Sequence, residues 1–231
     1  MKILFLTGAG ISAESGISTF RDSDGLWEHY RIEDVCTDTA LIRNPALVHE
    51  FYNQRRRDML RAEPNAAHRA IARLLERGHD VRVVTQNVDN LHERGGMPAD
   101  RVLHLHGELT MARAVNRPDL TFDLPALGIT DTDPVTPVCG HLVRPHIVFF
   151  GEAVPNLEPA ADLVHQADML VIVGTSLQVY PAASLINYAR PGTPTVYIDP
   201  RPAAVPAGVS IIAKPATAGM ADLLATLDTT F

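Results

Sequence analysis

The chain has 231 residues and a formal net charge of −7, with 46% hydrophobic and 20% charged residues. This composition predicts one globular domain with a sizeable core, and it excludes disordered, collagen-like and coiled-coil proteins. The acidic balance gives the chain no means of coating nucleic acid or an anionic membrane, so we expect neither as a partner. Two cysteines are too few for a disulfide framework. Because no signal-peptide pattern or long apolar run occurs either, we expect a cytoplasmic protein.

Short apolar runs alternate with helical stretches along the chain, which is the pattern of βαβ units. The runs are continuously apolar, and this predicts a parallel sheet that is buried on both faces. The fold class we expect is therefore α/β, a Rossmann-like parallel sheet with helices on both faces. The predicted strands are residues 2–7, 81–85, 102–105, 147–150, 169–173 and 195–199, with a weaker one at 209–213.

Capping residues predict where helices begin and end. Asn44 followed by Pro45 indicates the start of one helix, and Asn65 indicates the start of another that ends at Gly78. Later helices are predicted at residues 158–166, 182–188 and 218–227.

Two segments do not follow the strand and helix alternation. Residues 28–63 are helical and rich in arginine, and residues 108–144 are rich in Pro, Asp and Thr. We interpret both as insertions that form a small second module beside the sheet, with a cleft between the modules where a ligand can bind. The predicted division is a Rossmann-like domain of residues 1–27, 64–107 and 145–231, and a small domain of residues 28–63 and 108–144.

A glycine-rich turn, Gly8-Ala9-Gly10-Ile11-Ser12-Ala13, follows the first predicted strand and fits Gly-x-Gly-x-x-Gly/Ala. Glycine there lets the backbone approach a pyrophosphate, whose charge meets amide groups at the start of the next helix. A glycine-rich turn without a nucleotide is the alternative. The acidic ribose ligand usual about 20 residues further on is not clearly present, and Asp199, at the end of a late strand, is a candidate for that role.

Polar residues also follow the next two predicted strands. Thr85-Gln86-Asn87-Val88-Asp89-Asn90 lies at a carboxyl strand end, where such sheets place ligand contacts, although a capped turn is the alternative. His104 and His106 share one face of the following strand. A neutral histidine is a natural general base, but a lone strand histidine more often has a structural role. We favour His106 as the base, because Gly107 beside it leaves room for a substrate.

Seven motifs occur in the order found in one protein family. They are GAGIS at residues 8–12, GISTFR at 16–21, GLW at 25–27, TQNVDNLH at 85–92, HLHGE at 104–108, FGE at 150–152 and GTS at 174–176. Together they resemble the sirtuins, which are NAD-dependent protein lysine deacylases, over essentially the whole chain. The resemblance implies NAD in the cleft between a Rossmann-like domain and a small domain. It also implies that the acyl-lysine oxygen attacks the nicotinamide ribose, that nicotinamide leaves, and that the acyl group moves to ADP-ribose.

The resemblance implies roles for the matching residues. His106 is the general base on a ribose hydroxyl, and Asn87 is the second catalytic residue. The matching NAD contacts are Gly8, Ala9, Gly10 and Ser12 for the phosphates, Phe20 and Arg21 for the reacting ribose, Gln86 and Asn87 for the ribose and its water, Asp89 for the nicotinamide amide, and Gly174, Thr175, Ser176, Asp199, Pro200, Arg201 and Ala216 for the adenosine side.

The acyl-lysine peptide is implied to add as a strand between residues 148–152 and 178–180, with weak sequence preference. The matching substrate contacts there are Val148, Phe150, Gly151, Glu152 and Val179.

Tyr52 and Arg55 are three residues apart, so on a helix both face the same way. A guanidinium can grip a carboxylate with two hydrogen bonds, and a phenol can add a third. This pair resembles that of the sirtuins that remove succinyl, malonyl or glutaryl groups, whereas the alternative is a solvated helix face. Cys36 replaces the small alanine usual near that acyl pocket, which predicts a narrower pocket or shorter acyl chains.

The second insertion departs from many sirtuins, which carry two Cys-x-x-Cys pairs after the His-Gly motif. Here only Cys139 and His141 remain, and two ligands cannot complete a structural zinc site. We therefore expect no zinc, and we expect the insertion to hold itself by packing and turns. The candidate packing residues are Phe122, Leu124, Leu127 and Ile129.

The favoured reading is a monomeric NAD-dependent lysine deacylase that acts on carboxylate-bearing acyl groups and also deacetylates. An NAD hydrolase or ADP-ribosyltransferase is the second candidate, and a non-catalytic NAD-binding sensor is the third. A dehydrogenase would share the glycine-rich turn, but hydride transfer leaves the nicotinamide bond intact.

Overall fold

The computed structural model describes residues 1–18 and 30–230. Its main element is a six-stranded sheet with the order β3-β2-β1-β7-β8-β9, in which every neighbouring pair is parallel. The Rossmann-like α/β fold expected from the sequence is confirmed. The strands are β1 (Lys2–Thr7), β2 (Asp80–Thr85), β3 (Val102–His104), β7 (Met169–Val173), β8 (Thr195–Ile198) and β9 (Ser210–Ile212).

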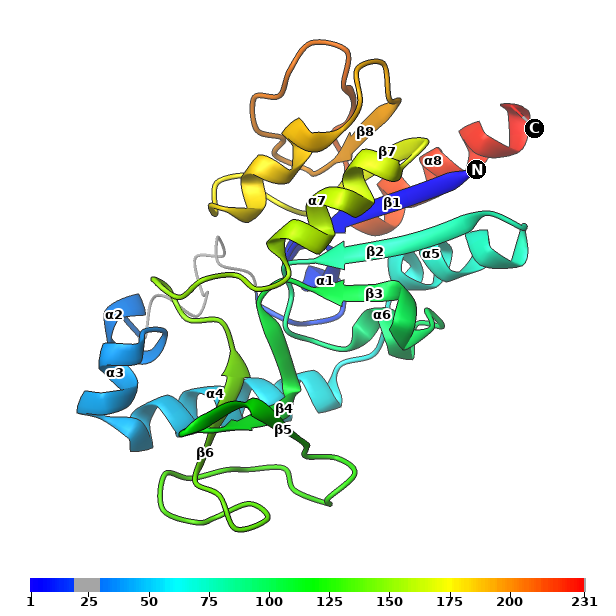
Figure 1. Cartoon of the computed structure of the whole chain (residues 1–231). Coiled ribbons are helices and arrows are strands. Elements are labelled where there is room, and N and C mark those ends of the chain that lie inside the picture. The colour runs from blue at the N-terminus through cyan, green and yellow to red at the C-terminus, as the bar shows by residue number, and fades with distance from the viewer. Residues whose placement is uncertain (19–29, 231) are drawn as a thin grey trace.

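Helices cover both faces of this sheet (Figure 1). Ile3 and Phe5 of β1 point into one core, which includes side chains of α5 (Ala66–Glu76) and α8 (Ala216–Thr230). Leu4 and Leu6 point into the opposite core, against α7 (Leu157–Gln166) and the 3-10 helix η3 (Ala182–Tyr188). Burial on both faces explains why the strands are continuously apolar.

The predicted helix starts are also present. The Asn44 side chain accepts from the Leu47 amide and caps α4 (Pro45–Arg61), with proline in its first turn. Asn65 accepts from the amides of Ala67 and His68 at the start of α5, and the His68 ring accepts from the Asn65 amide in return. These bonds satisfy amide groups that a helix start leaves unpaired.

The two inserted segments meet in a small module beside the main sheet (Figure 1). One contributes α2 (Ile32–Val35), α3 (Asp38–Arg43) and α4, and the other contributes a three-stranded antiparallel sheet with the order β5-β4-β6. Arg56 of α4 is 1% exposed and donates to the carbonyls of Leu109 (2.5 Å) and Thr130 (2.8 Å). The strands are β4 (Gly107–Ala114), β5 (Arg117–Asp123) and β6 (Val143–Ile147).

Residues 147–150 do not form a strand of the main sheet, so that prediction is wrong. The strand there is β6, which pairs with β4 of the small module. Ile147 and Phe149 are apolar because they pack against Val48 and Phe51 of α4. A run buried against one helix therefore has the same sequence signature as a strand buried in a parallel sheet.

The second insertion is held by a core of its own, as expected. Leu124 is fully buried in it, and Phe122 and Ile129 pack against it, whereas Leu127 is 45% exposed and does not contribute. Across residues 1–18 and 30–230, no helix is long and apolar enough to cross a membrane.

Candidate active site

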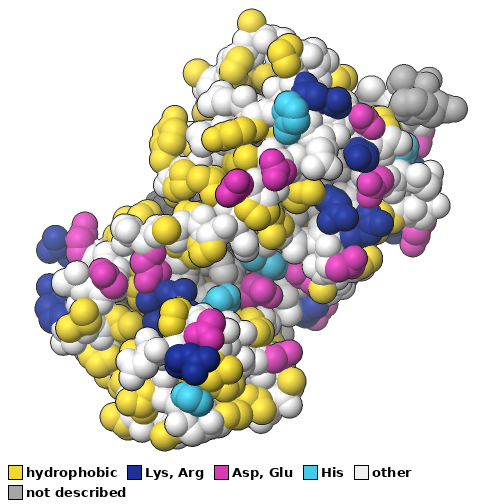
Figure 2. All heavy atoms as spheres, in the orientation of Figure 1, with side chains coloured by type: hydrophobic (Ala, Val, Ile, Leu, Met, Phe, Trp, Pro, Cys, Tyr) yellow, Lys and Arg dark blue, Asp and Glu magenta, His cyan; other side chains and the backbone are white. Residues whose placement is uncertain are grey.

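The candidate site residues follow the carboxyl ends of β1, β2, β3, β7 and β8. Thr7 is in register with Thr85 and Val173, and Thr85 is in register with His104. The turns that follow these strands therefore meet at one edge of the sheet, where open parallel sheets bind ligands. The molecule narrows between the main sheet and the small module, and histidine side chains are visible at this waist (Figure 2).

The glycine-rich turn after β1 packs directly against the turn after β7. A Cβ atom on Gly10 would lie 2.7 Å from the Cα of Gly174, and a Cβ on Gly174 would lie 2.3 Å from the Ile11 nitrogen. The amides of Gly10, Ile11 and Ser12 donate to carbonyls of the chain, so a bound pyrophosphate would have to share or replace these bonds. The glycines thus serve a contact between two turns, which the sequence alone did not indicate.

We expect Gly174→Ala to lower the free energy of unfolding by about 2–5 kcal/mol, because it adds overpacking to a left-handed backbone. Gly174 has a φ of 63°. Gly208→Ala is the matched control: its φ is 93°, but no atom lies within 4 Å of the added Cβ, so only the strain of about 1–2 kcal/mol remains. Urea unfolding measures both, and equal losses would contradict the close contact.

Ser12 is the centre of a buried polar network. Its hydroxyl donates to Asp89 Oδ2 (3.0 Å) and accepts from Asn87 Nδ2 (3.2 Å). His68 Nε2 lies 3.4 Å from the same oxygen, and because its Nδ1 accepts from the Asn65 amide, Nε2 carries the proton and donates. Burial lowers the pKa of His68 to about 4, so the ring is neutral. The Ser12 hydroxyl has all its partners, and Asn87 and Asp89 are fixed beside it.

His106 has the geometry of a general base. Its Nδ1 lies 2.9 Å from the Gln86 carbonyl oxygen, which can only accept, so Nδ1 carries the proton of the neutral ring. Nε2 then keeps its lone pair. Burial lowers the pKa of His106 below its ordinary value, against the opposing effect of the Gln86 bond. The ring is therefore neutral at pH 7 and able to take a proton.

The turn after β7 and the end of β8 also contribute residues to the site. Gln86 Nε2 donates to Thr175 Oγ1 (2.9 Å), which joins the turns after β2 and β7. Ser176 is partly exposed beside it, and Asp199, 6% exposed at the end of β8, accepts from the Arg201 amide (2.8 Å). Pro200 and Arg201 are exposed, whereas Ala216 is only 4% exposed and packs in the core.

Phe20 and Arg21 lie outside the described residues, as does the predicted motif at 25–27. Their predicted contacts with the reacting ribose stay a prediction.

Tyr52, Cys36 and Arg55 lie together on the small-module side. The Tyr52 hydroxyl donates to Cys36 Sγ (3.3 Å), and the Tyr52 ring stacks on Phe149 with centroids 5.8 Å apart. Burial raises the pKa of the Cys36 thiol to about 11 and that of Tyr52 well above its ordinary value, so both groups are neutral. The phenol is held as a donor, and its present acceptor is a weak one.

Arg55 is a half-buried cation. Its guanidinium lies over the Phe51 ring, 4.5 Å from the centroid, and no ion pair joins it to any residue that the structure describes. Its Nε is buried without a hydrogen-bond partner in that part of the chain. Burial lowers the pKa of Arg55, but a guanidinium stays charged at neutral pH. An anion entering beside Tyr52 would therefore find a donor and a positive charge.

The Glu152 side chain points into the small module. It accepts from Arg144 (2.6 Å), Arg113 (3.2 Å) and the Phe149 amide (2.8 Å). The guanidinium of Arg144 also lies 3.8 Å from the centroid of the Phe149 ring. Glu152 thus braces the loop before it, and its carboxylate is not free to bind a peptide.

The segments predicted to bind the peptide differ in how much they expose. Phe150 is 47% exposed and follows Phe149, while Gly151 is exposed with a φ of 90°. Val148 is partly buried and its amide donates to the His106 carbonyl (2.9 Å). Val179 is 38% exposed in the loop after β7.

A metal centre was not expected, and that expectation stays a prediction. Within residues 1–18 and 30–230, no group of three or more His, Cys, Asp and Glu side chains could hold a metal ion. Cys139 is exposed in a tight turn that ends at His141.

We expect the purified protein to contain no stoichiometric zinc, because the chain lacks the four ligands of a structural site. A chelator should leave the melting temperature unchanged, since no metal-linked folding energy is lost. Elemental analysis by mass spectrometry measures the metal content. About one tightly bound equivalent of zinc would contradict the prediction.

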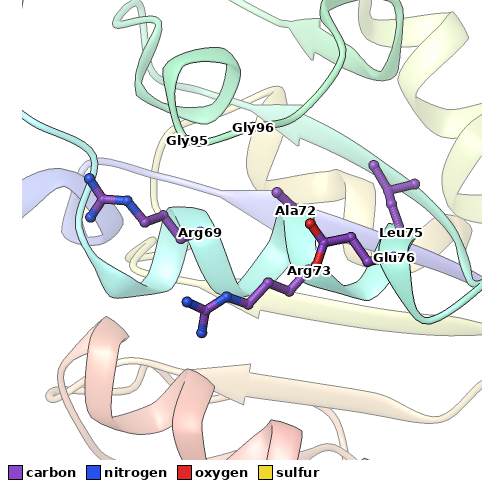
Figure 3. A pocket seen from close by; sticks show the side chains of 7 residues that line it. All are labelled: Arg69, Ala72, Arg73, Leu75, Glu76, Gly95 and Gly96. Carbon is purple, nitrogen blue, oxygen red and sulfur yellow. The ribbon is translucent and has the colours of Figure 1, made fainter.

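A separate shallow pocket lies on α5 (Figure 3). Arg69 and Arg73 extend from this helix, and the Gly95-Gly96 turn passes over it. No candidate site residue lines this pocket.

The sequence did not reveal several residues that shape the site. His68 lies within the helix predicted to start at Asn65, and its place three residues after that N-cap, the position of a capping box, is the signal that could have identified it. Arg113 and Arg144, which hold Glu152, carry no comparable signal.

The fold and the strand-end site define an α/β protein with a neutral histidine at the carboxyl ends of its parallel strands, where such sheets bind nucleotides. The Sir2 family model matches residues 8–181. A relative from Aggregatibacter actinomycetemcomitans is 55% identical over 200 residues, covering 85% of this chain and 92% of the relative. One from Helicobacter pylori is 48% identical over 229 residues, covering 96% of each. Both relatives are named NAD-dependent protein deacylase.

Solved structures agree with this match. A Sir2 homologue bound to ADP-ribose has a TM-score of 0.89 and 36% identity, covering 99% of this chain and 92% of its own. A Sir2 homologue in complex with NAD has a TM-score of 0.87 and 37% identity, covering 99% of this chain and 90% of its own. This chain belongs to the Sir2 family.

Proposed function

We propose that the chain is an NAD-dependent protein lysine deacylase that prefers acyl groups ending in a carboxylate. Its family and the names of its relatives support the deacylase. The acyl preference is supported by one observation: Arg55 is a half-buried cation without an ion-pair partner among the described residues, and its charge acts on the buried Tyr52 hydroxyl. Cys36 fills the space next to this hydroxyl, which favours the shorter carboxylate-bearing chains.

NAD is the co-substrate, and its nicotinamide ribose supplies the carbon that the acyl oxygen attacks. Asp89 holds the nicotinamide amide, while Asn87 and Gln86 hold the ribose. The turns at residues 8–12 and 174–176 contact the phosphates and the adenosine side, together with Asp199 to Arg201. The buried bonds of Ser12 to Asn87 and Asp89 support these roles, because they fix both side chains before a ligand enters.

His106 takes a proton from a ribose hydroxyl. Its Nε2 lone pair receives that proton, and the oxygen that has lost it attacks the acyl carbon. The bond from this carbon to the lysine nitrogen then breaks, the lysine amine leaves with a proton, and a water molecule completes the transfer of the acyl group to ADP-ribose. The Nδ1 bond to Gln86 holds the ring in the required tautomer. Phe20 and Arg21 are proposed to bind the same ribose.

The acyl-lysine peptide adds as a strand between residues 148–152 and 178–180. The exposed Phe150, Gly151 and Val179 support this placement. Glu152 contributes through its backbone, since Arg113 and Arg144 already hold its carboxylate.

We also propose that the enzyme acts as a monomer in the cytoplasm and binds no nucleic acid. Its net charge of −7 and its two unpaired cysteines support this proposal.

The test is mass spectrometry of the protein with NAD and equal amounts of acetyl-lysine and succinyl-lysine peptides. Faster loss of succinyl, with matching succinyl-ADP-ribose, is the expected result. Loss of the acetyl group alone would support deacylase activity but refute the proposed preference for carboxylate-bearing acyl groups. Nicotinamide without deacylated peptide would indicate NAD hydrolysis, and no nicotinamide at all would indicate a sensor or a dehydrogenase.

A further inference from the structure

His104 is the histidine of the HLHGE motif that the proposed reaction does not use. It ends β3 and is 7% exposed, and its carbonyl accepts from Asn156 Nδ2 (2.8 Å). Each ring nitrogen faces an oxygen: Nδ1 lies 3.1 Å from the Asn87 carbonyl, and Nε2 lies 2.8 Å from a Glu93 carboxylate oxygen. Carbonyl and carboxylate oxygens can only accept a hydrogen bond.

Only a ring with a proton on both nitrogens donates to both oxygens, because a neutral ring would turn a lone pair toward one of them. The ionisable groups that face His104 are Glu93 of α6 (Leu91–Arg94), Glu108 of β4, Asp89 before α6, and His92. Burial lowers the pKa of His104, but the Glu93 bond and the charges of Glu93 and Glu108 raise it more, so the net direction is upward. His92 is neutral, because burial holds its pKa well below the ordinary value.

The pair of His104 and Glu93 is a poor source of stability. The Glu93 Oε2 atom is buried without a hydrogen-bond partner among the described residues. Such an atom costs free energy, and buried ion pairs often add little net stability. The pair is better explained by the orientation it gives to the loop after β2.

The two histidines of the motif hold consecutive carbonyl groups of that loop. His106 Nδ1 donates to Gln86, and His104 Nδ1 donates to Asn87. We propose that His104, protonated on both ring nitrogens, is a positioning residue that bridges Glu93 and the Asn87 carbonyl and thereby fixes the loop that orients His106. The effect of His104 on catalysis depends on the proposed function.

Two variants separate this role from a merely structural one. In His104→Asn the amide stands near the place of Nδ1 and can donate to the Asn87 carbonyl. In His104→Gln the amide stands near the place of Nε2 and reaches Glu93 instead, which keeps the buried carboxylate paired. A structural role predicts that Gln is tolerated at least as well as Asn. The positioning role predicts the opposite order for kcat.

We expect His104→Asn to keep kcat within about threefold of the wild type and His104→Gln to lose about tenfold, because only the second loses the Asn87 bond. Wild-type kcat should also fall as the pH rises through the His104 pKa. The neutral ring has one N–H, which donates its hydrogen bond to Glu93, so the bond to the Asn87 carbonyl is lost. His104→Asn cannot titrate, so this fall should be absent. Equal kcat values, the reverse order, or a fall that persists in His104→Asn would overturn the proposal.

Calorimetric NAD binding by the same variants keeps the inference separate from the proposed function. Should the wild type bind NAD and deacylate no peptide, the proposed function fails, but His104→Gln should still bind NAD more weakly than His104→Asn. Equal affinities would overturn the positioning role. Absence of NAD binding in the wild type would overturn both.

Discussion

Replacing His106 with asparagine is expected to lower the rate of acyl transfer by about 10²- to 10⁴-fold, the usual contribution of a general base. The asparagine amide can donate to the Gln86 carbonyl as Nδ1 does, so the loop keeps its bond. The amide nitrogen has no lone pair available for a proton, so the ribose hydroxyl is not activated. The base acts after nicotinamide has left. In His106→Asn, exchange of labelled nicotinamide into NAD should therefore continue, while deacylated peptide should no longer be formed.

The pH dependence gives a second check on His106. The pKa of the ring is lowered by burial, so the lone pair is present at pH 7 and is lost only as the pH falls through that lowered pKa. Wild-type acyl transfer should therefore persist below pH 6.5 before it declines. The exposed His165 provides the control, since His165→Asn should change neither rate nor profile. If His106→Asn kept a rate of acyl transfer within tenfold of the wild type, His106 would be ruled out as the general base.

Burial against helices on both faces made most of the main sheet predictable. β7 is apolar at every position, β1 is apolar at every buried position except Thr7, and the weak run at residues 209–213 does form β9. The failure at residues 147–150 has a physical cause: Ile147 and Phe149 are buried by α4 of another segment. Sequence pattern reports that a residue is buried, but it does not report which element buries it.

The site was predictable where it follows from strand direction. Polar residues after parallel strands must meet at one edge, so Asn87, His106 and Thr175 could be grouped from the sequence. Partners of side chains were not predictable, because they depend on tertiary contacts between distant residues. Ser12 and Asp89 are 77 residues apart, and no sequence pattern pairs Glu152 with Arg113 and Arg144.

The arginines of α4 show the same limit. Arg55, Arg56 and Arg57 are consecutive, and the sequence does not indicate how their environments differ. Arg56 is in fact buried, and its guanidinium binds carbonyls of the second insertion. Arg57 pairs with Glu50 and Asp131. Arg55, by contrast, has no ion-pair partner among the described residues, which singles it out for an incoming carboxylate.

Replacing Arg55 with methionine should therefore reduce succinyl-lysine turnover far more than acetyl-lysine turnover. Removing one partner of a desolvated charge pair costs about 2–5 kcal/mol, so kcat/KM for the succinyl peptide should fall at least about 30-fold. The acetyl group has no carboxylate, and methionine retains apolar contact with Phe51, so acetyl turnover should stay within a few-fold of the wild type. Tyr52→Phe should give a smaller loss of the same selectivity, since the ring still stacks on Phe149.

The control is Arg61→Met on the same helix, because the Arg61 side chain is 76% exposed and its contact with Asp58 is long, at 3.9 Å. An exposed pair of this kind contributes little, so both peptides should react at wild-type rates. The decisive quantity is the ratio of kcat/KM for the succinyl peptide to that for the acetyl peptide. A ratio unchanged by Arg55→Met would show that the Arg55 cation does not recognise the carboxylate of the acyl group. The burial of Arg55 would then contribute to packing alone.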